Sequence, residues 1–324
     1  MKKKVSLILS LFFVLSFCAF APAEGAAADS QLTVVQWIDL GQKNMAAKNF
    51  DAAIDAFNKA TVLDPNYAAA YYNLGLAYNA KGLNSIAVDN FNKALQCKPN
   101  DANTYSKRGR SYFYLGKLDL AMADYNNALR LDKELAEAYY YRGEGYKVQN
   151  QLDSALPDLN KALELNPQLA GAYAVRGNVY YAQGKGDLAI EDYNSAIGLN
   201  PRRAQIYNDR GNAYADKQQY GLAIADYTQA IALDPGQAAF YNNRAVAYDG
   251  NNQSDLALAD FTKAIELNPK DSVAYSNRGN SYLKAKQYAF ALADFNKALE
   301  LNPQNKDAVE GQKLASLRMG AKPE

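Results

Sequence analysis

The chain has 324 residues, with 35 basic and 34 acidic side chains and no histidine. This near-neutral balance provides no basic field to attract nucleic acid or an anionic membrane. The lack of histidine removes the usual metal ligand, the commonest general base and any nucleophile paired with histidine. Composition therefore argues against nucleic-acid binding and against the common hydrolytic sites, and it predicts no metal and no cofactor.

Residues 1–23 have the layout of a secretory signal peptide. Lys2–Lys4 form a basic cap, and the apolar run Val5–Phe17 is too short for a comfortable membrane span. We expect cleavage after Ala23 and export to the periplasm or the exterior of a bacterial cell. The alternative is an outer-membrane lipoprotein with a lipid anchor at Cys18, although the bulky Phe17 departs from the small residue that a lipoprotein box carries there.

The mature chain is expected to begin with a flexible lead, residues 24–33, which is rich in alanine. Thr33, followed three residues later by Gln36, predicts a capping box at the start of the first helix. Past Ala23 the only cysteine is Cys97, so an intramolecular disulfide is excluded. Cys97 is interpreted as a small packed residue, with a reactive thiol or an intermolecular bridge as the alternatives.

A pattern with a period of 34 residues fills most of the chain. Each unit carries a tyrosine, a small residue, an alanine and a closing proline in one phase, as in Tyr207, Gly211, Ala223 and Pro235. Such self-similarity decides the architecture before any other feature. The eight predicted units cover residues 34–67, 68–101, 102–135, 136–169, 170–203, 204–237, 238–271 and 272–305. A helix over 306–319 is predicted to cap the array, and 320–324 form a tail.

Within a unit the apolar spacing predicts two antiparallel helices joined at a tight turn. In the unit 68–101, Gly82 marks the turn, Ser85 is expected to cap the second helix, and Pro99 ends the unit. Gly75 is expected to allow close approach to the second helix at Ala87. Acidic residues near the second-helix starts are interpreted as N-caps; these are Asp51, Asp119, Asp153, Asp187 and Asp255.

These residues resemble the tetratricopeptide repeat, and the match extends from Val34 to about Asn305. Departures are few: Asn44 replaces a tyrosine, Lys133 a proline and Ala245 a glycine. The resemblance implies an all-α, right-handed superhelical solenoid whose first helices line a concave groove. It also implies a non-catalytic scaffold for protein–protein interaction.

Comparison of the units with each other predicts a repeated ion pair. Six units carry an arginine before the small residue and an aspartate sixteen positions later, as in Arg210 and Asp226, whereas the first two units carry neither. Because the partners occur together or not at all, we expect a salt bridge between the two helices of one unit. The matching aspartates also argue against an arginine stripe that binds polyanions.

The resemblance places inward positions one turn away from the packed tyrosine and glycine. Aromatic rings are expected to anchor a partner in units two to five, and a ladder of asparagine amides is expected to hold an extended peptide backbone in units five to eight. The alternative is that these are ordinary exposed helix positions. The predicted groove residues are Tyr72, Leu76, Asn79, Ser106, Arg110, Phe113, Tyr114, Tyr140, Glu144, Lys147, Asn178, Tyr181, Asn208, Asn212, Asp216, Asn242, Val246, Asp249, Ser276, Asn280 and Lys284.

The expected partner is a protein or peptide, in a pathway of envelope assembly or secretion. Two alternatives stay open: a periplasmic scaffold for polysaccharide export, with aromatic residues touching the glycan, and a docking or regulatory subunit of a separate enzyme. No transmembrane segment is expected in the mature chain.

Overall fold

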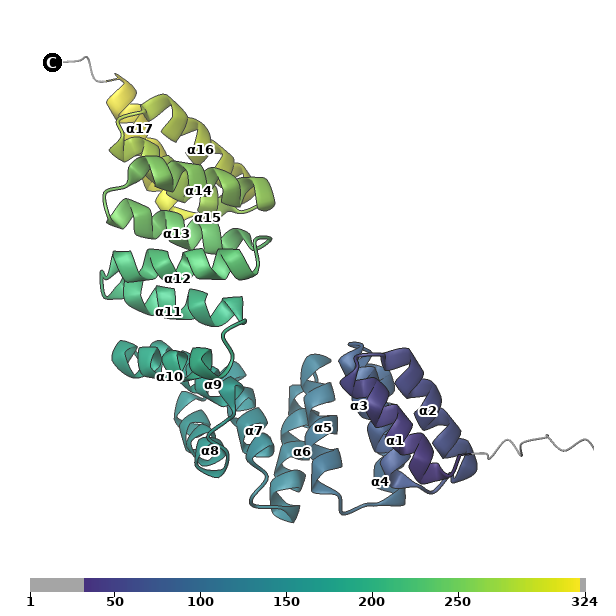
Figure 1. Cartoon of the computed structure of the whole chain (residues 1–324). Coiled ribbons are helices and arrows are strands. Elements are labelled where there is room, and N and C mark those ends of the chain that lie inside the picture. Colours follow the sequence, from purple (N-terminus) through teal and green to yellow (C-terminus); the bar gives the residue numbers. More distant parts are fainter. Residues whose placement is uncertain (1–31, 321–324) are drawn as a thin grey trace, which may run out of the picture.

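The computed structural model describes residues 32–320. The predictions for the signal peptide, for Cys18 and for most of the lead lie outside this range. The described part consists of helices joined by short turns, which confirms the all-α solenoid (Figure 1). The helices are α1 (Val34–Ala46), α2 (Phe50–Leu63), α3 (Ala68–Ala80), α4 (Asn84–Cys97), α5 (Ala102–Tyr114), α6 (Leu118–Leu131), α7 (Ala136–Val148), α8 (Leu152–Leu165), α9 (Ala170–Ala182), α10 (Gly186–Leu199), α11 (Ala204–Asp216), α12 (Tyr220–Leu233), α13 (Ala238–Gly250), α14 (Ser254–Leu267), α15 (Ser272–Lys284), α16 (Tyr288–Leu301) and α17 (Lys306–Gly320).

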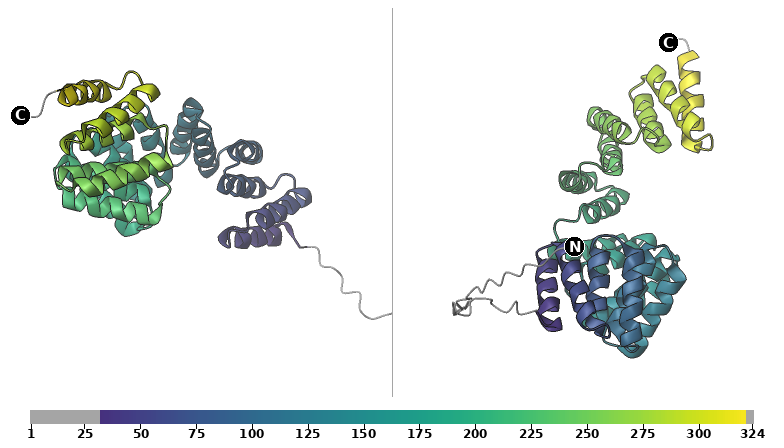
Figure 2. Two further views of the ribbon diagram at one scale, coloured as in Figure 1. Left: turned by 90° about the horizontal axis from the view of Figure 1, so that it is seen from above. Right: turned by 90° about the vertical axis from the view of Figure 1, so that its right-hand side faces the viewer.

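The helices stack in pairs, and α17 adds a final single helix against α16 and α15. Each odd-numbered helix packs on its own even-numbered partner and also contacts the next odd-numbered helix. Among the described residues, successive even-numbered helices do not contact one another. The odd-numbered helices are therefore closer together and line the inner side of a curved array, whose winding path appears in two views (Figure 2).

The core of each unit is a ring or leucine on the second helix that fits against the glycine of the first, or against Ala245 in the seventh unit. A Cβ atom on Gly75 would lie 2.4 Å from Phe91, and one on Gly177 would lie 2.8 Å from Tyr193. The close neighbour is thus the residue sixteen positions later. The predicted close approach near the alanine also holds: Ala87 is fully buried, and in the equivalent pair a Cβ atom on Gly177 would lie 3.3 Å from the carbonyl oxygen of Ala189. The ring sixteen positions later is the nearer neighbour.

The helix starts correct two further expectations. α4 begins at Asn84, so Ser85 lies inside the helix and makes no cap. Asp51, Asp119, Asp153, Asp187 and Asp255 lie in the first turn, two residues beyond the N-cap position. There a carboxylate still interacts favourably with the helix dipole. The capping box of Thr33 and Gln36 is confirmed, since each side chain bonds the other residue's backbone N–H.

The turn inside each unit needs a residue in the left-handed region. Gly82, Gly116 and Gly184 have φ near +70°, and the same position holds Lys48, Asn150, Gln218, Asn252 and Lys286, with φ between 57° and 61°. A Cβ atom is disfavoured in this conformation. Five of the turns therefore carry backbone strain that glycine would relieve.

Replacing Gln218 by glycine is expected to stabilise the array by about 1 kcal/mol, because the left-handed conformation costs a side chain roughly that much. The measurement is the urea midpoint followed by far-UV circular dichroism. Gly184→Ala at the corresponding turn of the preceding unit is the control and should lower the midpoint. Equal responses of the two variants would contradict this explanation.

The predicted ion pairs are present in all six units. Arg210 donates from Nε to Asp226 Oδ2 at 2.8 Å and from Nη2 to Asp226 Oδ1 at 2.7 Å, a two-pronged contact between α11 and α12. The aspartates are buried and the arginines are half-buried. The hydrogen bond to Asp226 raises the pKa of Arg210, although burial opposes this shift.

The same arginines also join neighbouring units, which the sequence comparison did not predict. Arg210 Nη1 donates to Asn194 Oδ1 at 2.6 Å on the second helix of the preceding unit, and Arg244 uses Thr228 in the same way at 3.1 Å. In α17, Gln312 takes the arginine position and donates to Asn296 at 2.6 Å. Each arginine thus fixes both the helix pair and the unit-to-unit angle.

Candidate functional site

The inner surface formed by the odd-numbered helices is the candidate site. Its first section, in units two to four, is an aromatic cluster around Arg110. The Arg110 guanidinium lies 4.5 Å from the ring centre of Tyr114 and 4.8 Å from that of Tyr141, and it pairs with Glu144 of the next unit. Tyr140 stacks beside Tyr141 with ring centres 5.0 Å apart.

These contacts decide which side chains remain open to a partner. Glu144 favours the charged form of Arg110 and raises its pKa, against the effect of burial. Burial also raises the pKa of Tyr140, because the charged phenolate is disfavoured away from water. Arg110 is therefore committed to holding the cluster together, whereas Tyr114, beside it, is 58% exposed.

The other predicted aromatic and aliphatic residues of this half are partly covered. Tyr72 packs against Phe91 with ring centres 5.9 Å apart, Leu76 is half-buried, and Phe113 lies beside Tyr114 at 6.1 Å. Farther along, the Tyr181 hydroxyl donates to Asp216 Oδ2 at 2.6 Å, which joins units five and six. Burial and this hydrogen bond raise the pKa of Tyr181 to about 12.

The expected asparagine ladder is largely engaged within the protein. Asn178 and Asn212 accept from the hydroxyls of Tyr193 and Tyr227 at 2.7 and 2.8 Å. Asn242 accepts from Asn277 at 3.1 Å. The side-chain oxygens of these amides are thus used between or within units, and their NH₂ groups are what remains for a partner.

Asn208 is a correction to the predicted groove. It is only 5% exposed and accepts from Asn243 Nδ2 at 2.9 Å. Ser106 and Ser276, at the same position of their units, are 1% and 2% exposed. In these three units the side chain at this position is covered, and Asn208 is covered by Asn243 of the following unit. At the same position of other units, Tyr72, Tyr140, Ala174 and Asn242 are partly exposed.

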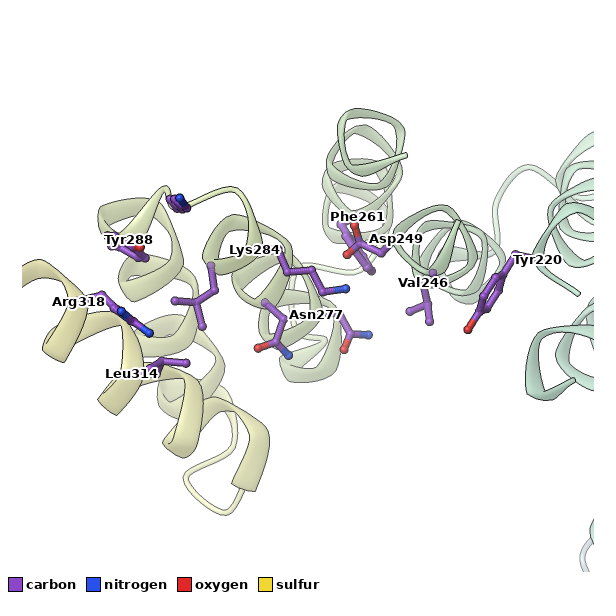
Figure 3. A pocket seen from close by; sticks show the side chains of 13 residues that line it. Tyr220, Val246, Asp249, Phe261, Asn277, Lys284, Tyr288, Leu314 and Arg318 are labelled. Atoms are coloured by element: carbon purple, nitrogen blue, oxygen red, sulfur yellow. The ribbon is translucent and has the colours of Figure 1, made fainter. Parts of the chain in front are cut away.

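The second open section is a groove of about 780 Å³ near the C-terminal end. It lies between α13, α15 and α17, with Tyr220 and Tyr288 at its edges (Figure 3). Predicted residues that line it are Val246, Asp249, Asn280 and Lys284. We name this surface the C-terminal groove.

Several lining residues were missed from the sequence. Each first helix has a second inward position, one residue after the predicted one. It holds Tyr141, Asn243 and Asn277. The inward face of a helix is wide enough to include two adjacent positions. Leu314 and Arg318 belong to α17, which the sequence predicts only as a capping helix. Among residues 32–320 there is no cluster of histidine, cysteine or acidic side chains suited to a metal ion.

Within the part of the chain that the structure describes, no helix combines the length and apolar character needed to cross a bilayer. Cys97 is half-buried at the end of α4, near the carbonyl oxygen of Pro65.

Comparison with solved structures shows the fold. One chain of the APC/C hetero-tetramer Cut9–Hcn1 superposes with a TM-score of 0.67 at 20% identity, covering 82% of this chain and 52% of that one. This protein thus spans about half the length of that relative. A tetratricopeptide repeat protein from Parabacteroides merdae gives 0.55 at 22% identity, covering 76% and 98%. The C-terminal part of a repeat-containing protein from Cytophaga hutchinsonii gives 0.54 at 22% identity, covering 74% and 98%.

A search of curated proteins finds no match. Family models do match. The model described as tetratricopeptide repeat covers residues 136–169, 238–271 and 272–305, and a second model of that description covers 68–101. The model described as TPR repeat covers 41–82, 109–147, 177–218 and 211–252. Together these matches extend over most of the sequence, and the chain belongs to the tetratricopeptide repeat family.

Proposed function

We propose that this protein is a non-catalytic scaffold that binds a peptide segment or a partner protein on its concave face, in cell-envelope assembly or secretion. The observation that carries the proposal is the inner surface itself. It offers an exposed ring at Tyr114 in one half and the C-terminal groove in the other. Rings of this kind dominate binding energy at protein interfaces.

The ties between units support a preformed surface. Each two-pronged arginine contact fixes one helix pair, and its third nitrogen fixes the preceding unit. A partner would then meet an inner face whose shape is already set, so less conformational entropy is lost on binding. The proposed mechanism is passive and needs no chemical step.

A photoreactive amino acid at position 114, in cells of the source organism, tests the proposal. We expect discrete adducts with a secretion or envelope-assembly protein, identified by mass spectrometry. The matched control places the same group at Leu222, which is 52% exposed on the outer helix α12. Adducts with synthase components would favour the polysaccharide-export or enzyme-docking role instead. Adduct patterns that do not differ between the two positions would refute binding on the concave face.

Export is part of the proposal and has its own measurement. The mass of the mature N-terminus should correspond to cleavage before Glu24. A lipidated Cys18 would indicate the anchored alternative, and an intact Met1 would contradict export by a cleaved signal.

A further inference from the structure

The C-terminal groove carries three cationic side chains at its edge: Lys284, Lys286 and Arg318. None of them forms an ion pair with another described residue, and the one carboxylate in the lining is Asp249. Lysines on the other turns are of two kinds: among the described residues Lys48, Lys117 and Lys185 form no ion pair, whereas two others do. Lys81 and Lys217 pair with Asp51 and Asp187 of the preceding unit. The cationic charge of this groove is therefore left uncompensated by the protein.

Asp249 presents a buried acceptor that has no donor. Its Oδ2 atom accepts from the Ser281 hydroxyl, whereas Oδ1 is buried and has no hydrogen-bond partner. A buried acceptor without a partner is unfavourable, because it has lost its hydrogen bonds to water without gaining another. A ligand that brings an N–H group to Oδ1 would remove this cost.

The groove also offers apolar and amide contacts. Val246 and Leu314 are 46% and 45% exposed and face the groove from α13 and α17 (Figure 3). Asn277 donates to Asn242, which leaves its side-chain oxygen available, and Asn280 makes no side-chain hydrogen bond within residues 32–320. The lining thus combines positive charge, apolar surface, and both donors and acceptors.

We infer that the C-terminal groove binds an extended acidic peptide segment of the partner protein. Its carboxylates would contact Lys284, Lys286 and Arg318, and a backbone N–H would donate to Asp249 Oδ1. Separate apolar side chains of the peptide would pack on Val246 and on Leu314, which lie toward opposite ends of the groove (Figure 3). The volume of the groove is in the range of ordinary ligand sites. This inference rests on the proposed scaffold function and assigns one end of its surface, including α17, to a chemical class of ligand.

Fluorescence anisotropy with the purified mature protein tests the inference. The probe is a labelled nonapeptide that alternates glutamate and leucine, compared with the same peptide carrying glutamine in place of glutamate. We expect the acidic peptide to bind at least tenfold more tightly. Lys284→Glu and Arg318→Glu should each weaken its binding at least tenfold. Lys270→Glu makes the same charge change on the exposed turn before α15, outside the groove, and should alter binding less than twofold.

Two further probes separate a peptide from another polyanion. Methylation of the backbone nitrogens removes the N–H donors and should weaken binding, because Asp249 Oδ1 then gains no partner. Dextran sulfate should compete poorly. Unchanged binding after methylation, strong competition by dextran sulfate, or equal binding of the glutamine peptide would each overturn the inference. Far-UV circular dichroism confirms that the variants are folded.

The outcome is distinguishable from failure of the proposed function. A partner that is crosslinked at position 114 and binds the Lys284→Glu and Arg318→Glu variants unchanged would refute the acidic-peptide site while supporting the scaffold. Specific binding of the acidic peptide without any crosslinked partner would support the site and count against the proposed cellular role.

Discussion

Asp226→Leu is expected to lower the free energy of unfolding by ~3–5 kcal/mol, because it leaves a largely buried guanidinium without its carboxylate. The Arg210 side chain is 19% exposed and that of Asp226 is 8% exposed, so water compensates little of the lost contact. Arg210→Leu should cost a similar amount, since it strands the buried Asp226 and also leaves Asn194 without its donor. Urea unfolding followed by circular dichroism measures both effects.

The double variant decides whether these residues act as a pair. Two leucines facing each other remove both charges, so the double variant should be more stable than the sum of the single losses predicts. Additive losses would contradict the pairing. Glu266→Leu is the surface control: it breaks the exposed contact with Lys263 and should cost only ~0.2–1 kcal/mol. Because units couple mainly to their neighbours, hydrogen exchange should locate the loss of protection in α11 and α12.

Gly177→Val is expected to destabilise the array by ~1–3 kcal/mol, because a side chain at this position overpacks the helix pair. A Cβ atom there would lie 2.8 Å from the Tyr193 ring and 3.3 Å from the carbonyl oxygen of Ala189. The ring cannot easily move aside, since its hydroxyl donates to Asn178 at 2.7 Å. The urea midpoint should fall accordingly.

Gly198→Val is the matched control for this prediction. Gly198 lies in α10, and a Cβ atom there would meet nothing within 4 Å. Its midpoint should stay level or rise slightly, because valine is the better helix former. Ala245 shows that one Cβ atom is tolerated opposite Phe261, which is why valine rather than alanine is the informative substitution. A similar response at positions 177 and 198 would show that crowding against Tyr193 is not the cause.

Asp226→Leu also bears on function, through the shape of the inner surface. If the arginine contacts set the angle between units, a variant such as Asp226→Leu would also change the spacing of the odd-numbered helices around α11. A peptide that spans several units should be affected more than one confined to the C-terminal groove, which meets α12 only at Tyr220. The peptide assay applied to Asp226→Leu thus reports how far along the array a ligand extends.

Much of the architecture follows from the repeat alone. The period, the helix pairs, the inward side of the first helices and the pairing of Arg210 with Asp226 are all encoded in positions that recur unit after unit, since each unit meets only its neighbours. The physical reason is that stacking buries a stripe which no single helix pair can bury alone. The second unit has Leu74 and Asn90 at the two positions where six other units have arginine and aspartate. This joint change between units indicates the contact, which the sequence of a single unit could not do.

Only the tertiary structure decided which inward residues are free. Asn208 and Tyr114 both occupy inward positions by spacing, yet Asn208 is covered by Asn243 of the next unit while Tyr114 is exposed. That difference depends on the angle between adjacent first helices and on the size of each side chain. Likewise, the packing of α17 brings Leu314 and Arg318 into one groove with Val246 and Asp249. These two pairs of residues are far apart in the chain. The repeat therefore predicts the scaffold, and the packing between repeats determines its open surface.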